Sequence, residues 1–325
     1  MPHAIRIHQN GGVDQLVYEP IVVNPPQRGE VQVHHTAIGL NFIDIYYRTG
    51  LYPAPSGLPF IPGNEAAGVV TAVGEGVSEF AIGDRIAYAA TLGAYCTDRN
   101  IVADRVVKIP DGISDQTAAA MMLKGMTAEY LLHRTFKVEK HHTVLIHAAA
   151  GGVGLIAGQW AASMGARVIG TAGNAEKANL ARANGYSEVI EYKSENFVHM
   201  VKEMTDGVGV DVVYDSVGRD TWIRSLDCLK PRGMFVTFGQ SSGPIEGFTL
   251  GHLASRGSLF ATRPSLFAYT STRDDLELSS GRLFDMVLRG VVKIAVNRTF
   301  TLKDAAMAHE NLEGRRTTGA TVLIP

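Results

Sequence analysis

Cysteine is scarce in this chain. Cys96 and Cys228 are the only two among 325 residues, too few for a disulfide framework or a structural zinc cluster. No apolar run reaches the roughly 18 residues of a membrane-spanning helix, and the N-terminus lacks the charged region, apolar run and cleavage site of a signal peptide. We therefore expect a protein of the reducing cytoplasm.

Neither positive nor negative charge is in marked excess. The formal net charge is −2, which gives neither a basic face for nucleic acid nor a polybasic patch for a membrane. Apolar residues make up 46% of the chain and charged residues 19%, an ordinary globular composition with ample material for a core. The length suggests about two domains.

Glycine and proline punctuate the chain up to about residue 124. The short alternating or apolar runs between these turns predict a small antiparallel β barrel or sandwich. From about residue 268 the pattern changes to two helical runs, SSGRLFDMVLRG and LKDAAMAHENLEG, and a closing strand, ATVLIP. We expect residues 1–124 and 268–325 to form one discontinuous, β-rich domain.

Strand-like and helical runs alternate through the middle of the chain. The strands VLIHAA, RVIGTA, EVIEY, VDVVYD and MFVTFG are each separated from the next by a helical pattern. Strands and helices at this spacing predict a parallel, doubly wound sheet. The predicted fold class is therefore α/β, with residues 125–267 as a nucleotide-binding domain.

The first of these strands leads directly into a glycine-rich turn. Gly151, Gly152, Val153 and Gly154 follow VLIHAA, and a helix begins within the turn. Glycine lets backbone amides approach a pyrophosphate closely, and the helix N-terminus supplies partial positive charge. Ala149 stands where the stricter pattern has glycine. The strand–helix–strand context favours a dinucleotide site over an ordinary glycine turn.

Asn174 lies where an acidic residue often binds the ribose of NAD. It follows Gly173, twenty residues past Gly154, and Lys177 lies in the first turn of the next helix. A cation there opposes the helix dipole unless an anion binds it. The 2′-phosphate of NADP is such an anion, and a carboxylate at 174 would repel it. The sequence favours NADPH over NADH; alternatively, Lys177 is a solvated lysine and Glu176 satisfies the dipole.

Four stretches of the chain resemble the medium-chain dehydrogenase/reductase superfamily. They are AIGLNFIDIYYRTGLYP, PFIPGNEAAGVVTAVGEGVSEFAIGDRIAY, AAMMLKGMTAEYLL and HAAAGGVG. Within the superfamily, the whole chain is most similar to the zinc-free quinone oxidoreductases of the zeta-crystallin type, above all the bacterial NADPH:quinone reductases. The resemblance implies a GroES-like N-terminal domain, a Rossmann domain, a cleft between them and a homodimer.

The resemblance also implies further cofactor contacts by position. Tyr192 and Arg316 would join Lys177 around the 2′-phosphate. The residues expected along the cofactor are Phe238, Gln240 and Ser241, with Leu266 approaching the nicotinamide from the other side. Each has a plainer interpretation as a strand-edge, core or solvated residue.

The zinc ligands of the superfamily's alcohol dehydrogenases are replaced. The cysteine position reads Asn41, and the Gly-His-Glu motif reads Gly63, Asn64, Glu65. Because neutral amides are poor zinc ligands, we predict that no metal is bound. Alcohol oxidation usually needs a Lewis acid or a general base. A quinone already accepts electrons strongly, so positioning it against the nicotinamide supplies much of the catalysis.

Four residues are candidates for lining the substrate and nicotinamide pocket. Asn41 and Thr127 could hydrogen-bond the nicotinamide or an acceptor oxygen. Tyr46 and Tyr52 could stack on a flat ring or donate a hydrogen bond. Alternatively, Tyr46 belongs to the core and Tyr52 caps a turn. No residue is assigned as an acid or base.

The predicted function is NADPH-dependent, metal-free reduction of quinones by a homodimer. The run FATRPSLFAYT would supply an edge strand for pairing with a second copy, or else an interior strand. One rival is reduction of an activated C=C bond in an enal or enone, with Tyr52 donating to the carbonyl. A rival of another class is an RNA-binding or structural role, as in crystallin relatives, which the near-neutral charge disfavours.

Overall fold

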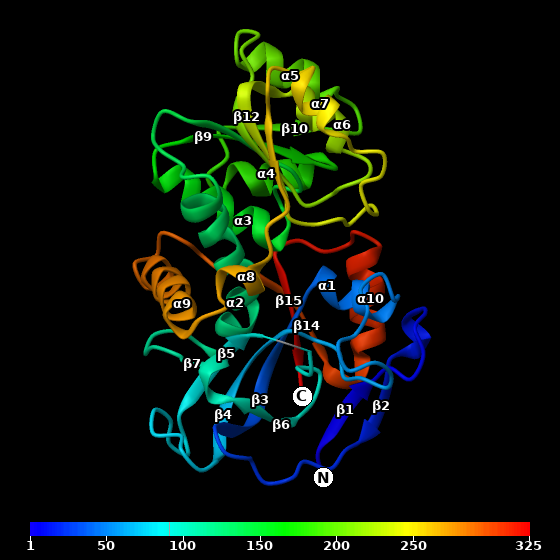
Figure 1. Ribbon diagram of the computed structural model, residues 1–325, viewed down its shortest axis with the longest axis vertical. Helices are drawn as coiled ribbons and strands as arrows, with labels where there is room; N and C mark the ends of the chain where they lie inside the picture. The colour runs from blue at the N-terminus through cyan, green and yellow to red at the C-terminus, as the bar shows by residue number, and fades with distance from the viewer. Residues whose placement is uncertain (91) are drawn as a thin grey trace. The chain divides into compact units, whose positions relative to one another are not determined.

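Two sheets of different character organise the chain (Figure 1). The computed structural model describes residues 1–90 and 92–325. These divide into a first unit, composed of Met1–Met126, Thr270–Phe284 and Ile294–Pro325, and a second unit, composed of Thr127–Tyr269 and Asp285–Lys293. Both chain termini belong to the first unit.

The sheet of the first unit is mostly antiparallel. In sheet order its strands are β14 (Val296–Thr301), β15 (Ala320–Ile324), β3 (Glu30–Leu40), β4 (Glu65–Val73), β5 (Arg85–Ala89) and β7 (Val107–Lys108), with β6 (Asp98–Val102) also paired to β3. Only β14 and β15 among these described strands run parallel. A separate ribbon pairs β1 (His3–Arg6) with β2 (Val17–Pro20). The predicted β-rich domain is thus confirmed as part of the fold class.

Helices close the first unit around an apolar core that includes Ile5, Val33, Ile86 and Leu323. They are α1 (Phe42–Arg48), α2 (Asp115–Tyr130), α9 (Arg273–Leu288) and α10 (Ala305–Glu313), with short 3₁₀ turns η1 (Val13–Gln15), η2 (Ala103–Arg105) and η4 (Leu302–Asp304). The last residues of α2 and α9 belong to the second unit.

The sheet of the second unit is parallel throughout. In sheet order its strands are β10 (Glu188–Glu191), β9 (Arg167–Ala172), β8 (Thr143–Ile146), β11 (Val210–Asp215), β12 (Leu229–Thr237) and β13 (Phe260–Thr262). The first strand, β8, lies inside the sheet and later strands are added on both sides of it. This order confirms the predicted doubly wound sheet.

Helices flank this sheet (Figure 1). They include α3 (Gly152–Ser163), α4 (Ala175–Arg182), α5 (Phe197–Met204) and α6 (Trp222–Asp227). The unit also contains α7 (Leu250–Ala254), α8 (Leu266–Tyr269) and a π-helical turn η3 (Leu131–Thr135) after α2. Within the described part of the chain, no helix is long and apolar enough to span a membrane.

Residues 285–293 were expected in the first domain but lie in the second unit. The side chain of Gln159 on α3 makes two hydrogen bonds with the backbone of Lys293. It accepts from the N–H at 2.9 Å and donates to the carbonyl at 3.1 Å. This paired contact ties the segment to α3.

Candidate functional site

The glycine-rich turn joins β8 to α3 in a tightly packed conformation. Ala148 takes a left-handed conformation (φ 54°), and its carbonyl accepts from Gly151 N–H at 2.9 Å. A Cβ at Gly154 would lie 2.7 Å from the Ala149 carbonyl oxygen, so a larger residue would push α3 away from the turn. The residues that begin the helix are Gly152, Val153 and Gly154. The N–H groups of a first helical turn have no acceptor within the helix and suit a phosphate group.

Asn174 caps helix α4 beside the end of β9. Its Oδ1 accepts from the backbone N–H of Lys177 at 2.9 Å. A Cβ at Gly173 would lie 3.2 Å from the hydroxyl of Tyr192, which places the ring against the backbone before the cap. The structure therefore brings Gly173, Asn174, Lys177 and Tyr192 together at the carboxyl edge of the parallel sheet.

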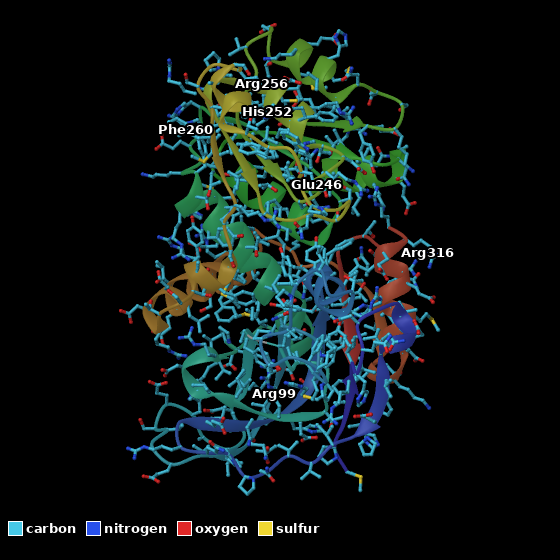
Figure 2. The ribbon with its side chains drawn as sticks, turned by 45° about the vertical axis from the view of Figure 1, so that its right-hand side comes forward. Arg99, Glu246, His252, Arg256, Phe260 and Arg316 are labelled. Atoms are coloured by element: carbon cyan, nitrogen blue, oxygen red, sulfur yellow. The ribbon has the colours of Figure 1, made fainter. Side chains whose placement is uncertain are left out.

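Arg316, which was expected to join Lys177 and Tyr192 around the 2′-phosphate, belongs to the first unit. It is exposed on the segment that follows α10 (Figure 2), and its guanidinium donates to Glu310 O at 3.3 Å. Its role beside Lys177 and Tyr192 stays a prediction.

The segment after β12 lies along the loop after β11. Phe238 N–H donates to Asp215 O at 2.8 Å, and Ser241 N–H donates to Ser216 O at 3.1 Å. The other two residues expected along the cofactor are Gln240, whose Oε1 accepts from Arg263 at 3.3 Å, and Leu266, which is buried at the start of α8. The four belong to the second unit, as the glycine turn does.

A buried polar network lies beneath this edge of the sheet. The ring of His147 contacts the hydroxyls of Thr171 and Ser225, both at 2.9 Å. Asp215 accepts from Thr221 Oγ1 at 2.7 Å and from Ser225 Oγ at 3.2 Å. Burial lowers the pKa of His147 below its ordinary value, so the ring is neutral. This network, which the sequence analysis missed, fixes the loops that carry the expected cofactor residues.

In the first unit, Asn41 belongs to a buried cluster around Glu65. The carboxylate of Glu65 is fully buried. Its Oε2 accepts from Asn41 Nδ2 at 2.8 Å and Lys124 Nζ at 3.0 Å, and its Oε1 accepts from Leu123 N–H at 2.8 Å. A Cβ at Gly39 would lie 2.7 Å from Glu65 Cδ. The cluster therefore depends on glycine at this point of β3.

The amide of Asn41 has a defined orientation. Because a carboxylate only accepts hydrogen bonds, the Nδ2 group must face Glu65. The carbonyl Oδ1 then points to the other side of the amide. Oδ1 faces the backbone N–H of Asp44 in the capping box of α1, and its second lone pair is what Asn41 can offer to a bound molecule. The amide hydrogens are directed to Glu65 and, weakly, to Gly39 O at 3.4 Å.

A chain of hydrogen bonds leads from Asp44 into the core. Arg48 donates to His309 Nδ1 at 3.3 Å, so Nε2 carries the proton and donates to the hydroxyl oxygen of Tyr95 at 3.1 Å. Tyr95 in turn donates to Asp44 Oδ2 at 2.9 Å, which also accepts from Asn41 N–H at 2.8 Å. Burial raises the pKa of Asp44 to about 7. Burial, with the nearby Arg48, lowers the pKa of His309 to about 3.

The two candidate tyrosines pack against each other. The rings of Tyr46 and Tyr52 are 5.2 Å apart in an edge-to-face arrangement, and Tyr52 N–H donates to Tyr46 O at 3.0 Å. Tyr46 is 8% exposed, as expected if it also belongs to the core. Thr127 is buried in the second unit, where its side chain hydrogen-bonds that of Tyr130.

The residues at the former zinc positions do not fit a zinc ion. Asn41 and Asn64 offer amides, and Nδ2 of Asn64 is used on Ala90 O at 2.8 Å. Glu65 is neutralised by Lys124 and accepts three hydrogen bonds. Across residues 1–90 and 92–325, no group of three or more His, Cys, Asp or Glu side chains is arranged to hold a metal.

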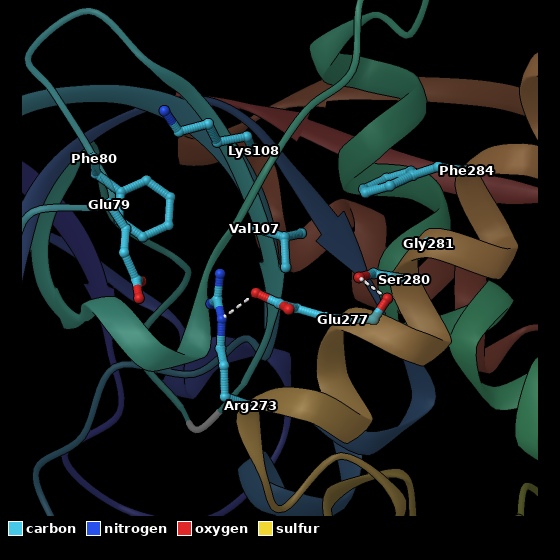
Figure 3. Close-up of a pocket in the computed structure, with 9 residues that line it drawn as sticks. All are labelled: Glu79, Phe80, Val107, Lys108, Arg273, Glu277, Ser280, Gly281 and Phe284. Atoms are coloured by element: carbon cyan, nitrogen blue, oxygen red, sulfur yellow. Dashed lines mark hydrogen bonds and ion pairs between the residues drawn. The ribbon is translucent and has the colours of Figure 1, made fainter.

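A separate cavity of about 370 Å³ lies in the first unit (Figure 3). Its lining residues are Glu79, Phe80, Val107, Lys108, Arg273, Glu277, Ser280, Gly281 and Phe284. Arg273 and Glu277, one turn apart on α9, form an ion pair at 2.7 Å among these lining residues. The cavity includes none of the residues expected from the sequence.

Comparison with known proteins gives full-length matches. The family described as alcohol dehydrogenase GroES-like domain matches residues 27–143, and the zinc-binding dehydrogenase family matches residues 152–274. The quinone oxidoreductase of Salmonella typhimurium is 51% identical over 328 residues, covering 100% of both chains. The 2-haloacrylate reductase of a Burkholderia species is 46% identical over 331 residues, covering 100% of this chain and 99% of the relative.

A solved structure matches equally well. The crystal structure of Escherichia coli quinone oxidoreductase complexed with NADPH has a TM-score of 0.97 and 49% sequence identity, and covers 99% of this chain and 100% of its own.

Proposed function

We propose that this chain, which belongs to the quinone oxidoreductase family of medium-chain dehydrogenases and reductases, reduces quinones with NADPH and without a metal. The observation that carries the proposal is the nucleotide edge of the second unit, where Asn174, Lys177 and Tyr192 gather near the glycine turn. Identity of 51% to a quinone oxidoreductase over the full length supports the substrate class.

We assign the binding of the cofactor to the glycine turn, to the cap of α4 and to the loops after β11 and β12. Gly151, Gly152, Val153 and Gly154 would bind the pyrophosphate through backbone N–H groups. Lys177 would bind the 2′-phosphate, with Asn174 contributing no repulsion. NADPH, when bound, supplies a hydride. Phe238, Gln240, Ser241 and Leu266 would orient it, and Tyr192 and Arg316 would complete the phosphate contacts.

The substrate side would be formed by Asn41, Tyr46, Tyr52 and Thr127. Asn41 would act as an acceptor, because its amide hydrogens are directed to Glu65. Tyr46 and Tyr52 present a paired aromatic surface on which a flat quinone ring could stack. Exclusion of water and orientation of the ring are the contributions we assign to these side chains.

One alternative has a specific observation in its favour. The 46% identity to a 2-haloacrylate reductase is compatible with reduction of an activated C=C bond. We propose the quinone because quinone oxidoreductases match at 50% to 51% over the full chain. A direct comparison of kcat/KM for benzoquinone, an enone and a haloacrylate tests the choice, and a higher value for either alkene would reverse it.

The chain is proposed to work as a cytoplasmic homodimer. Strand β13 is the edge of the parallel sheet, and Phe260 on it is 58% exposed, at the outer margin of the second unit (Figure 2). An uncovered edge strand favours pairing with a second copy. Two buried free cysteines, Cys96 and Cys228, suit a reducing compartment.

A further inference from the structure

Lys124 is a buried lysine in the first unit. Its side chain is 7% exposed, and its helix neighbours Met121, Met122 and Met126 are fully buried. An ammonium has three N–H donors. Among the described residues, the structure gives Nζ one acceptor, Glu65 Oε2 at 3.0 Å. Two donors are thus available to a molecule that enters the cluster.

A purely structural role explains this arrangement poorly. Removing two charges from water is costly, and a buried ion pair is often no more stable than apolar residues of the same volume. The surrounding helix is apolar, so replacing both Lys124 and Glu65 by apolar residues of similar volume would cost little, whereas losing Lys124 alone would leave the carboxylate of Glu65 buried and unpaired. The Lys124 ammonium and the Asn41 amide both donate to Glu65 Oε2. This arrangement therefore indicates a chemical role for the ammonium.

We propose that Lys124 is a catalytic residue that donates a hydrogen bond to the quinone oxygen on which negative charge develops, and then protonates it. The inference rests on the proposed function. Asn41 cannot fill this role, because its N–H groups face Glu65 and Gly39 O. Glu65 fixes the position of the Lys124 ammonium through their contact at 3.0 Å, so the donor is oriented before the substrate arrives.

The reaction balances with this proton. Reduction of a quinone to a hydroquinone requires two electrons and two protons. The hydride brings both electrons and one proton, and NADPH becomes NADP⁺. The second proton comes from Lys124: its N–H bond breaks, the quinone O–H bond forms, and the amine regains a proton from water.

The test compares Lys124→Met with the wild-type chain on benzoquinones of decreasing reduction potential. Loss of one preorganised donor typically lowers kcat about 100-fold, and we expect a larger loss for weaker acceptors, which need more help. Lys137→Met, at a lysine that is 81% exposed, is the matched control and should retain the wild-type rate. A Lys124→Met enzyme with wild-type rates, or an equal loss for every quinone, would overturn the proposal.

Lys124→Arg provides a variant that keeps the ion pair and the fold. Arginine can donate a hydrogen bond but does not release its proton, so we expect at least a tenfold lower kcat. A full wild-type rate for this variant would overturn the proton transfer.

Binding of para-nitrophenol in the presence of NADP⁺ gives a readout independent of turnover. The wild-type protein and Lys124→Arg should bind the coloured phenolate and lower its apparent pKa, whereas Lys124→Met should not. Identical titrations of all three proteins would contradict the assignment. If the wild-type chain reduces no quinone, the proposed function fails, while this titration still decides whether Lys124 binds a phenolic oxygen.

Discussion

Replacing Asn174 by aspartate should weaken NADPH binding while leaving the fold intact. Aspartate caps a helix as well as asparagine, so the bond from Lys177 N–H, 2.9 Å in the wild type, should persist. The added charge would face the 2′-phosphate. At a separation of about 6 Å in a water-like dielectric, two unit charges repel by about 0.7 kcal/mol. A phosphate of charge about −2 then costs about 1.4 kcal/mol, or tenfold in affinity.

The assay is steady-state kinetics with each nicotinamide cofactor. KM for NADPH should rise about tenfold, and KM for NADH should fall, because a carboxylate can bind the ribose hydroxyls. The effect on NADPH should shrink in high salt. Asn196→Asp is the matched control, since Asn196 caps α5 in the same way. An unchanged KM for NADPH in Asn174→Asp would refute a 2′-phosphate at this cap.

Three further predictions concern assembly, pH and stability. Phe260→Asp on the edge strand should convert the dimer into monomers in light-scattering chromatography, while Val208→Asp, at a site 59% exposed, should not. Burial raises the pKa of Asp44 to about 7. Between the unfolded and folded pKa values, Asp44 is therefore ionised in the unfolded chain but still protonated in the folded chain. Raising the pH from about 4 to 7 should therefore lower the free energy of unfolding by up to about 1.4 kcal/mol per pH unit. Paired urea titrations should show no such loss in Asp44→Asn. A difference in unfolding free energy between the two proteins that stays constant with pH would contradict this. Gly281→Ala should stabilise the protein by about 0.5–1 kcal/mol in urea unfolding, because a Cβ at this position of α9 meets no atom within 4 Å. Gly125→Ala should destabilise the protein, because its Cβ would come within 2.6 Å of Leu283 Cδ2.

Local patterns predicted the parts of the fold that depend on neighbours in sequence. The strand–turn–helix at Gly151–Gly154 follows from backbone requirements a few residues long. The alternation of strands and helices likewise predicted the parallel sheet. The placement of Asp285–Lys293 was not predicted, because it depends on the contact of Lys293 with Gln159, 134 residues earlier.

The buried polar clusters escaped the sequence analysis for the same reason. Arg48 and His309 are 261 residues apart in the chain, and Lys124 is 59 residues from Glu65, so no local periodicity links them. One signal was present: Lys124 is the cation in the otherwise apolar run AAMMLKGM, and a charge on a buried helix requires a partner. That argument predicts a partner but does not identify Glu65.

The most direct test of the account is oxidation of NADPH and of NADH by benzoquinone, with and without a metal chelator. We expect rapid, chelator-resistant oxidation of NADPH and slow oxidation of NADH, as metal-free chemistry and the contacts at Asn174 and Lys177 require. Equal rates with the two cofactors would contradict the 2′-phosphate site, loss of activity with chelator would contradict metal-free reduction, and no turnover with either cofactor would contradict the proposed function itself.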